Sequence, residues 1–131
     1  MASTTPSAAQ QRAAVVTATN TERRKAGCSA LTVDPRLASG AQGHAADMAK
    51  NNYFSHTSRN GTSFGDRIRA TGARFRTAGE NIAKGQPTAA AVVKAWMNSA
   101  GHRRNILNCG FTRIGVGFDA RGNYWVQDFT G

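Results

Sequence analysis

Two segments near the C-terminus, "TRIGVGFDA" and "NYWVQDFTG", alternate apolar and polar residues, and they flank the turn-forming sequence "ARGN". Alternation with a period of two is typical of strands that bury one face. A short polar connection between two such strands indicates a β-hairpin. The end of the chain is therefore predicted to form part of an antiparallel sheet, and the fold must provide cover for it.

Helical patterns fill most of the chain before this hairpin. The segment "RFRTAGENIAKG" interrupts them and is predicted to be extended, with a turn at each glycine. Helices that precede strands in this order favour an α+β domain, in which helices cover an antiparallel sheet. The expected helices are residues 8–26, stopped by Gly27; a helix beginning at Pro35 after the N-cap Asp34 and ending at Asn51 and Asn52; a short helix in "SFGDRIRATGA" ending at Gly72; and a helix in "PTAAAVVKAWMNSAG", capped by Thr88 and stopped at Gly101.

The chain is strongly basic, with 17 Lys and Arg against seven Asp and Glu and a formal net charge of +10. Such a charge attracts polyanions, which include nucleic acids, anionic lipid headgroups and cell-wall polymers. A merely solvated basic surface is the alternative. The sequence has no basic helix with heptads, no zinc-finger spacing and no basic-aromatic sheet pattern. Sequence-specific binding of nucleic acid is therefore not expected.

Two cysteines, Cys28 and Cys109, are separated by 81 residues, and no C-x-x-C pair occurs. This favours one disulfide in an exported protein, and two buried free thiols are the alternative. No stretch approaches the roughly 18 apolar residues of a membrane span. The first residues show no signal-peptide pattern, so Met1 is interpreted as a start that replaces a removed signal. We expect a flexible segment over residues 1–9 and one domain over residues 10–131.

Glu80 is one of only two glutamates, and it lies in the mostly apolar segment "AGENIAKG". Among the three histidines, His44 falls within a predicted helix and is interpreted as structural or half-exposed. His56 and His102 lie next to turn-forming residues, where functional histidines are commonly found. Two imidazoles and a carboxylate form a typical zinc ligand set, but no spacing rule connects these three residues. A buried Glu80 bonded to an arginine or to backbone N–H groups is the alternative.

Five motifs, in the order "YFSHTS", "GENIAKG", "AWMNSAGHRRNIL", "IGVGF" and "YWVQDF", resemble the CAP superfamily of cysteine-rich secretory proteins, antigen 5 and pathogenesis-related class 1 proteins. The resemblance is to the short bacterial branch and covers about residues 10–131. The segments "AGCSALTVDPRLA" and "NILNCGF" are similar to exported actinobacterial members and support a Cys28–Cys109 disulfide. The resemblance implies an α-β-α sandwich with a central antiparallel sheet between helical layers.

The resemblance also implies a surface cleft that is lined by two histidines and two acids and can hold zinc. Matched by motif, the histidines are His56 and His102, and the first acid is Glu80, which would orient an imidazole or a water molecule. The position of the second acid, three residues after the tryptophan of "AWMNS", is occupied by Ser99. The cleft is thus expected to keep three of its four residues.

Three functions agree with this resemblance. The first is a secreted, monomeric binding protein whose cleft or basic surface engages an anionic polymer or a lipid at the cell envelope. The second is a zinc-assisted hydrolase, in which His56 and His102 hold the metal and Glu80 is the general base. The third is a structural domain associated with the cell wall that retains a relic cleft. The missing second acid weakens the hydrolase hypothesis.

Overall fold

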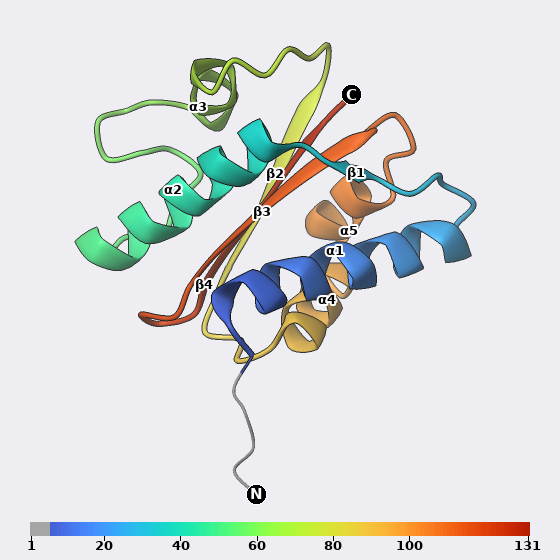
Figure 1. The fold of residues 1–131 in the computed structure, drawn as a ribbon, viewed down its shortest axis with the longest axis horizontal. Coiled ribbons are helices and arrows are strands. Elements are labelled where there is room, and N and C mark those ends of the chain that lie inside the picture. The colour runs from blue at the N-terminus through green and yellow to red at the C-terminus, as the bar shows by residue number, and fades with distance from the viewer. Residues whose placement is uncertain (1–5) are drawn as a thin grey trace, which may run out of the picture.

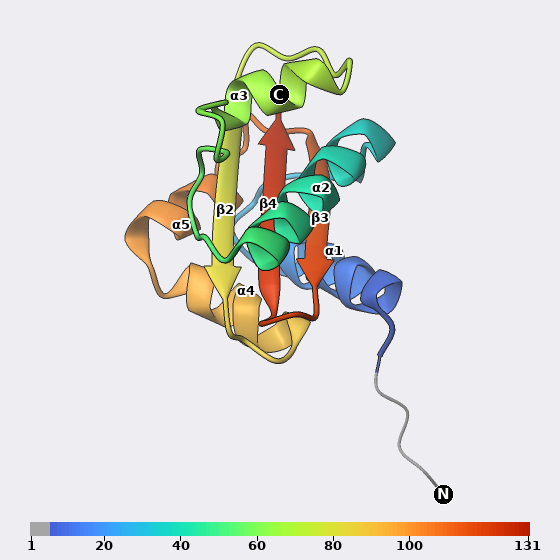
Figure 2. The same cartoon turned by 90° about the vertical axis from the view of Figure 1, so that its left-hand side faces the viewer.

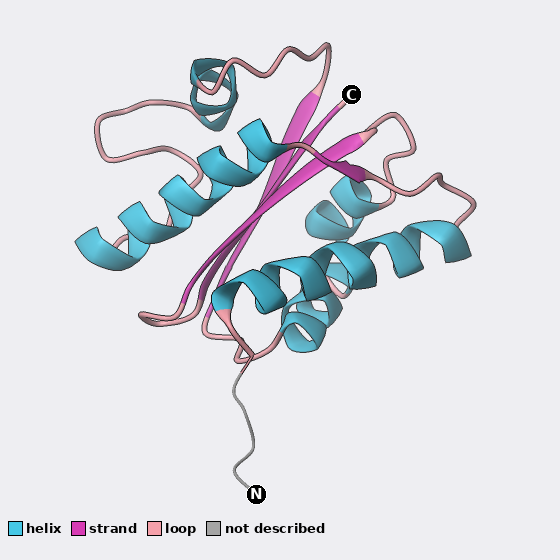
Figure 3. Ribbon diagram, in the orientation of Figure 1, coloured by secondary structure: helices cyan, strands magenta, loops and turns pink. Residues whose placement is uncertain are grey.

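A computed structural model describes residues 6–131, which form a four-stranded sheet between two helical layers (Figure 1). Helices α2 and α3 lie on one side of the sheet, and α1, α4 and α5 lie on the other (Figures 1 and 2). The predicted α+β class and the α-β-α sandwich are confirmed. The elements, coloured by type in Figure 3, are α1 (Ala8–Lys25), β1 (Thr32–Val33), α2 (Pro35–Asn51), α3 (Phe64–Ala70), β2 (Ala78–Lys84), α4 (Ala89–Met97), α5 (Ala100–Ile106), β3 (Arg113–Asp119) and β4 (Tyr124–Thr130).

The sheet has the strand order β1-β3-β4-β2, so β2 lies at one edge. Strands β3 and β4 form the predicted antiparallel hairpin, and β2 pairs antiparallel with β4. The predicted antiparallel pairing holds for β2, β4 and β3, and the two-residue strand β1 adds a parallel pairing with β3. Asp34, directly after β1, donates its N–H to the carbonyl of Ile114 and at once begins α2.

Polar side chains start the helices where the sequence indicated. Asp34 accepts a hydrogen bond from the N–H of Arg36 at the start of α2, and Pro35 occupies the first turn. Thr88 caps α4 in the same way. Helix α1 begins at Ala8 with a capping box between Ser7 and Gln10. Part of the predicted flexible segment, residues 1–5, lies outside the described residues.

Two glycines do not have the roles predicted for them. Gly79 lies within β2 rather than in a turn. Glycine fits this position because a Cβ there would come within 3.0 Å of the Phe111 ring. Gly101 lies within α5, and the break between α4 and α5 falls instead at Asn98 and Ser99. A glycine signal therefore marked close packing in one case and a tolerated helix position in the other.

Two further glycines explain how closely α2 approaches the sheet. A Cβ on Gly115 or Gly117 of β3 would come within about 2.1 to 2.3 Å of the α2 backbone. Only glycine permits this contact. It places α2 directly above β3 and β4, where the core includes Ala41, Ala45 and Met48.

The opposite side of the sheet holds the larger core, which includes Val15, Trp96, Ile106, Trp125 and Phe129. At one end of this layer Cys28 and Cys109 form a disulfide, which confirms the predicted bond and excludes two free thiols. Beside it, the buried guanidinium of Arg23 donates hydrogen bonds to four backbone carbonyls, those of Ser29, Ile106, Asn108 and Phe111. Within residues 6–131, the helices are all too short or too polar to cross a membrane.

Candidate functional site

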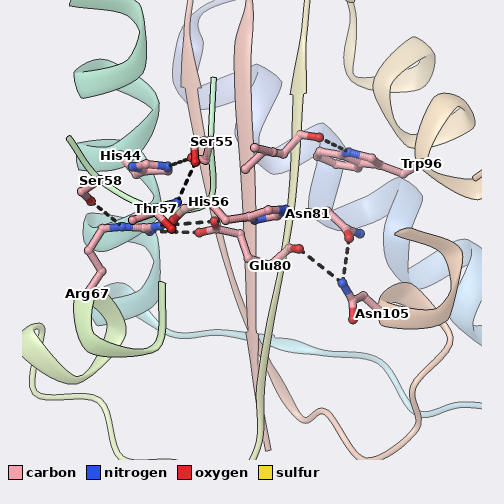
Figure 4. A network of polar contacts seen from close by, with 11 residues as sticks. His44, Ser55, His56, Thr57, Ser58, Arg67, Glu80, Asn81, Trp96 and Asn105 are labelled. Atoms are coloured by element: carbon pink, nitrogen blue, oxygen red, sulfur yellow. Dashed lines mark hydrogen bonds and ion pairs between the residues drawn. The ribbon is translucent and has the colours of Figure 1, made fainter. Parts of the chain in front are cut away.

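Glu80 lies in the middle of the edge strand β2, and its side chain is fully buried. It faces the α2 side of the sheet, between β4 and the loop that follows α2 (Figure 4). Arg67 of α3 reaches it with both terminal nitrogens, at 3.0 Å to Oε2 and 3.2 Å to Oε1. The alternative considered from the sequence, a buried Glu80 bonded to an arginine, therefore describes part of the environment of Glu80.

His56 joins the same carboxylate. Its Nδ1 lies 3.0 Å from Oε1 of Glu80, and 48% of its side chain is exposed. Because an ionised carboxylate only accepts hydrogen bonds, Nδ1 must carry the proton, which leaves Nε2 as the free ring atom. Arg67 also holds the loop, since it donates to the Ser58 hydroxyl and to the His56 carbonyl.

Asp128 is a second carboxyl group at this site that sequence reasoning missed. It is the direct cross-strand partner of Glu80 on β4 and is 1% exposed. Burial and the neighbouring Glu80 raise the pKa of Asp128 well above its usual value. Burial would also raise the pKa of Glu80, but hydrogen bonds with His56, Asp128 and Arg67 lower it to about 2. The pair thus carries one negative charge on Glu80 and one proton on Asp128.

Asparagines fix the other face of β2 to α5. The Asn105 side-chain amide donates to the Glu80 carbonyl at 3.3 Å and to Oδ1 of Asn81 at 2.9 Å. Asn81 in turn donates to the His102 carbonyl at 3.1 Å. Trp96 of α4 donates its ring N–H to the carbonyl of Ile82 (Figure 4). These bonds hold the helix that carries His102 against the strand that carries Glu80.

Two hollows lie along β2. One, of about 490 Å³, is lined at the start of the strand by His56, Ser63, Phe64, Glu80 and Asn105, among others. The other, of about 400 Å³, is lined near the end of the strand by Phe54, Ile82, Trp96, Ser99 and His102, among others. Both linings are more apolar than polar, and the second is the more apolar of the two. We call the two together the β2 cleft.

The structure therefore brings His56 and Glu80 into contact and places His102 in the adjoining hollow. No hydrogen bond or ion pair connects the His102 ring to either of them within residues 6–131. Burial and the nearby His56 lower the pKa of His102, which keeps its imidazole neutral at pH 7. Ser99 caps α5 by position but accepts no side-chain hydrogen bond there.

A metal at the cleft would have a small donor set. In the part of the chain that the structure describes, no three His, Cys, Asp or Glu side chains are grouped as metal ligands. The free Nε2 of His56 and the neutral ring of His102 are suitable donors for zinc. Two imidazoles with water in the other positions fit a weak site only.

His44 has the structural role predicted for it. It is 2% exposed on α2, and its Nε2 lies 2.7 Å from the carbonyl of Ser55, to which it donates (Figure 4). Burial and the charge of Arg67 lower the pKa of His44, so it packs as a neutral ring. Its contact with Ser55 helps place the loop that carries His56.

Sequence comparisons give the context of this fold. The chain is 50% identical over 117 residues to the uncharacterised protein YkwD of Bacillus subtilis, which covers 89% of this chain and 46% of that protein. It is 43% identical over 111 residues to the uncharacterised membrane protein YlbC of the same organism, over 85% of this chain and 32% of that protein. The chain thus spans less than half of the length of these relatives.

Solved structures agree. An extracellular protein with an SCP domain from Bacillus anthracis superposes with a TM-score of 0.89 at 36% identity, over 99% of this chain and 45% of that one. An outer surface protein of Borrelia burgdorferi superposes with a TM-score of 0.81 at 25% identity, over 88% of each chain. The profile of the CAP family, described as the cysteine-rich secretory protein family, matches residues 16–129. The chain belongs to the CAP family.

Proposed function

We propose that this chain is an extracellular binding domain whose β2 cleft engages a ligand of the cell envelope. Two structural neighbours are described as an extracellular protein and an outer surface protein. The Cys28–Cys109 disulfide agrees with an oxidising location, because disulfides persist outside the cytosol. An envelope ligand that is anionic also suits the net charge of +10.

The observation that carries this proposal is the state of Glu80. Its two carboxylate oxygens already accept hydrogen bonds from His56 and Arg67, and its pKa is lowered to about 2. A general base works best with a pKa near the working pH. Glu80 is therefore better suited to orienting His56 than to removing a proton, which favours binding over hydrolysis.

The lining of the β2 cleft supports a ligand with two chemical parts. Phe54 is 49% exposed beside Ile82 and Trp96 and offers an apolar surface. His56 and Asn105 offer polar contacts in the adjoining hollow. An anionic lipid or a lipid-linked envelope polymer has both parts. Ligand pockets of this size usually combine an apolar wall with a few polar groups.

A zinc-assisted hydrolase is the second candidate function. It is favoured by the neutral state of His102 and by the orientation of His56 through Glu80. Zinc held by these two rings would act as a Lewis acid and lower the pKa of bound water. Ser99 at the position of the second family acid leaves the hydrolase without an evident base.

Vesicle binding tests the binding function. Vesicles of phosphatidylglycerol and of phosphatidylcholine would be compared in sedimentation assays at low and physiological ionic strength. We expect binding to the anionic vesicles that weakens with salt and falls at least fivefold in Phe54→Ala. Val33→Ala is the matched control, since Val33 is 47% exposed away from the cleft. Equal losses in both variants, or no binding by either, would contradict the proposal and favour a structural role.

Calorimetry with zinc tests the metal site. We expect weak binding at pH 7 that His56→Ala and His102→Ala abolish and that Glu80→Gln reduces less, because Glu80 acts on the ring and not on the metal. Ser99→Glu should tighten binding by adding a carboxylate. Affinity should fall below about pH 6, as imidazoles protonate. Unchanged affinity in His56→Ala would exclude the cleft as the metal site, and hydrolysis gained only with zinc would favour the second candidate.

A further inference from the structure

A third hollow, of about 470 Å³, lies away from the β2 cleft, between α2, the loop around residues 58–60 and α3. Its volume falls within the range of 300–1,000 Å³ that is usual for small-molecule sites. No lining residue in this described part of the chain carries an aliphatic side chain. Six of the residues that line it are Gly43, Asp47, Asn51, Arg59, Asn60 and Arg67.

Gly43 leaves this hollow open at a cost to the helix. Glycine inside a helix is less favourable than alanine by about 1 kcal/mol. Gly40, one turn earlier, is explained by packing, because a Cβ there would lie 2.9 Å from the Thr71 methyl group. A Cβ on Gly43 would meet nothing within 4 Å. Packing therefore gives no reason for Gly43, whereas access to the hollow does.

The walls of the hollow are fixed by their own hydrogen bonds. Both oxygens of Asp47 are occupied, one by the Asn51 amide at 2.8 Å and the other by the Tyr53 hydroxyl. Asn60 accepts from Thr62 with its side-chain oxygen, at 2.7 and 3.1 Å. The Asn60 amide and the Asn51 side-chain oxygen remain as donor and acceptor for a ligand.

The hollow is lined by charges of both signs. Arg67 is committed to Glu80 and Ser58, and Asp47 accepts hydrogen bonds from Asn51 and Tyr53. Arg59 is exposed, and residues 6–131 place no carboxylate within salt-bridge distance of it. The other acids pair elsewhere, as Asp66 does with Arg69. Arg59 is thus the uncommitted charge at a rigid polar wall, where an anion can bind by charge-assisted hydrogen bonds.

From these observations we infer that this hollow is a binding site for a negatively charged sugar. A sugar acid or sugar phosphate supplies an anion for Arg59, and its hydroxyl groups both donate to Asn51 and accept from Asn60. The absence of aliphatic side chains from the described lining argues against a lipid chain here. This hollow shares none of its lining residues with the β2 cleft, to which the Arg67–Glu80 ion pair connects it, and the inference does not depend on the function proposed for that cleft.

NMR titration of the ¹⁵N-labelled chain tests the inference. The probes are glucuronate, glucose 6-phosphate and neutral glucose. We expect saturable shifts at the amides of Gly43, Arg59 and Asn60 with one or both charged probes. With glucose we expect at least tenfold weaker binding. Glucuronate alone would identify a carboxylate as the recognised group, and glucose 6-phosphate alone would identify a phosphate.

Variants separate this site from general attraction to a basic surface. Gly43→Phe fills the hollow and Arg59→Gln removes its charge, and each should weaken binding at least tenfold. Gly43→Gln is a second blocking variant if Gly43→Phe does not fold. Arg74→Gln, which removes an exposed arginine elsewhere, should leave binding unchanged. Binding that survives both blocking variants, shifts spread evenly over the exposed arginines, or equal binding of glucose would overturn the inference.

Discussion

Two arginines tie distant segments of the chain together, one on each side of the sheet, and they differ in their partners. Arg23 of α1 is 1% exposed and donates only to backbone carbonyls, beside the disulfide. Arg67 of α3 donates to a carboxylate, a hydroxyl and a carbonyl, and 15% of its side chain is exposed. Each arginine holds its segments together through a few hydrogen bonds to defined partners, where a hydrophobic core would use many apolar contacts.

The partners decide what each arginine can do. The carbonyls around Arg23 do not titrate, and they lie beside the Cys28–Cys109 disulfide, so a change of pH does not remove these acceptors. Arg67 shares Glu80 with the half-exposed His56. Glu80 and His56 line the β2 cleft, and Arg67 lines the hollow beside α2. A buried cation with neutral acceptors is structural, whereas one that shares a carboxylate with an accessible imidazole can respond to a ligand.

The largest effect should come from Arg23→Met. It leaves two buried carbonyls, those of Ile106 and Phe111, without their donor, and each unsatisfied buried group costs about 1–3 kcal/mol. We expect a loss of about 2–6 kcal/mol in the free energy of unfolding, measured by urea denaturation. Arg24→Met is the matched control on the exposed side of α1 and should change little. Similar values for both variants would remove the structural role of Arg23.

Removing the disulfide tests the same region by a different route. The double variant Cys28→Ala, Cys109→Ala opens a bridge across 81 residues, and such a loss costs about 2–5 kcal/mol. Because Arg23 holds the same segments through Ile106 and Asn108, we expect the variant to stay folded at low temperature. Thermal unfolding followed by circular dichroism measures the loss. A midpoint equal to that of the oxidised parent would contradict it.

Glu80→Gln breaks the cluster formed by Arg67, Glu80 and His56. The side chain keeps its shape but loses its charge, so Arg67 remains partly buried without an anion, and His56 loses its acceptor for Nδ1–H. We expect a loss of about 2–3 kcal/mol on urea denaturation. Asp66→Asn removes a surface partner of Arg69 and is the matched control, with no measurable loss expected. A loss as small as that of the control would mean that the cluster contributes nothing to stability.

Much of the fold followed from short-range signals. The hairpin, the cap at Asp34 and the helix in "PTAAAVVKAWMNSAG" each depend on neighbouring residues, and the structure has all of them. The parallel pairing of β1 and the roles of Gly79 and Gly101 depend on contacts with distant segments. Those contacts cannot be read from periodicity, which reports only which residues share a face.

The site was less accessible from sequence for the same reason. His56, Glu80 and His102 were selected by their motifs, and only the fold could show that Arg67 and Asp128 surround Glu80. Asp128 lies in "YWVQDF", whose alternating pattern indicated a strand with one buried face. That pattern was the one signal in the sequence that could have pointed to a buried carboxyl group at this position. The register that places it opposite Glu80 is set by the pairing of β2 with β4, whose paired residues are at least 40 positions apart.

The smallest and sharpest effect concerns the two adjacent carboxyls. The pKa of Glu80 is lowered to about 2, so its contribution to stability is present above about pH 4.5 and is lost as the pH falls toward 2. The pKa of Asp128 is raised, so its contribution is present below about pH 4 and is lost as the pH rises, since the unfolded chain releases a proton that the folded chain keeps. The pair should therefore stabilise the chain most near pH 4.

Asp128→Asn isolates the second half of this argument. The amide can donate to Glu80 as the protonated carboxyl does, and it carries no proton that unfolding would release. We expect the variant to match the parent at pH 4 and to exceed its stability at pH 7, the reverse of Glu80→Gln. Urea denaturation at both pH values measures this. A variant that loses stability at pH 7 would mean that Asp128 is ionised in the folded chain. The carboxylates of Glu80 and Asp128 would then both face Arg67. This side of the sheet would carry an unbalanced negative charge, which the hydrogen bonds around Glu80 argue against.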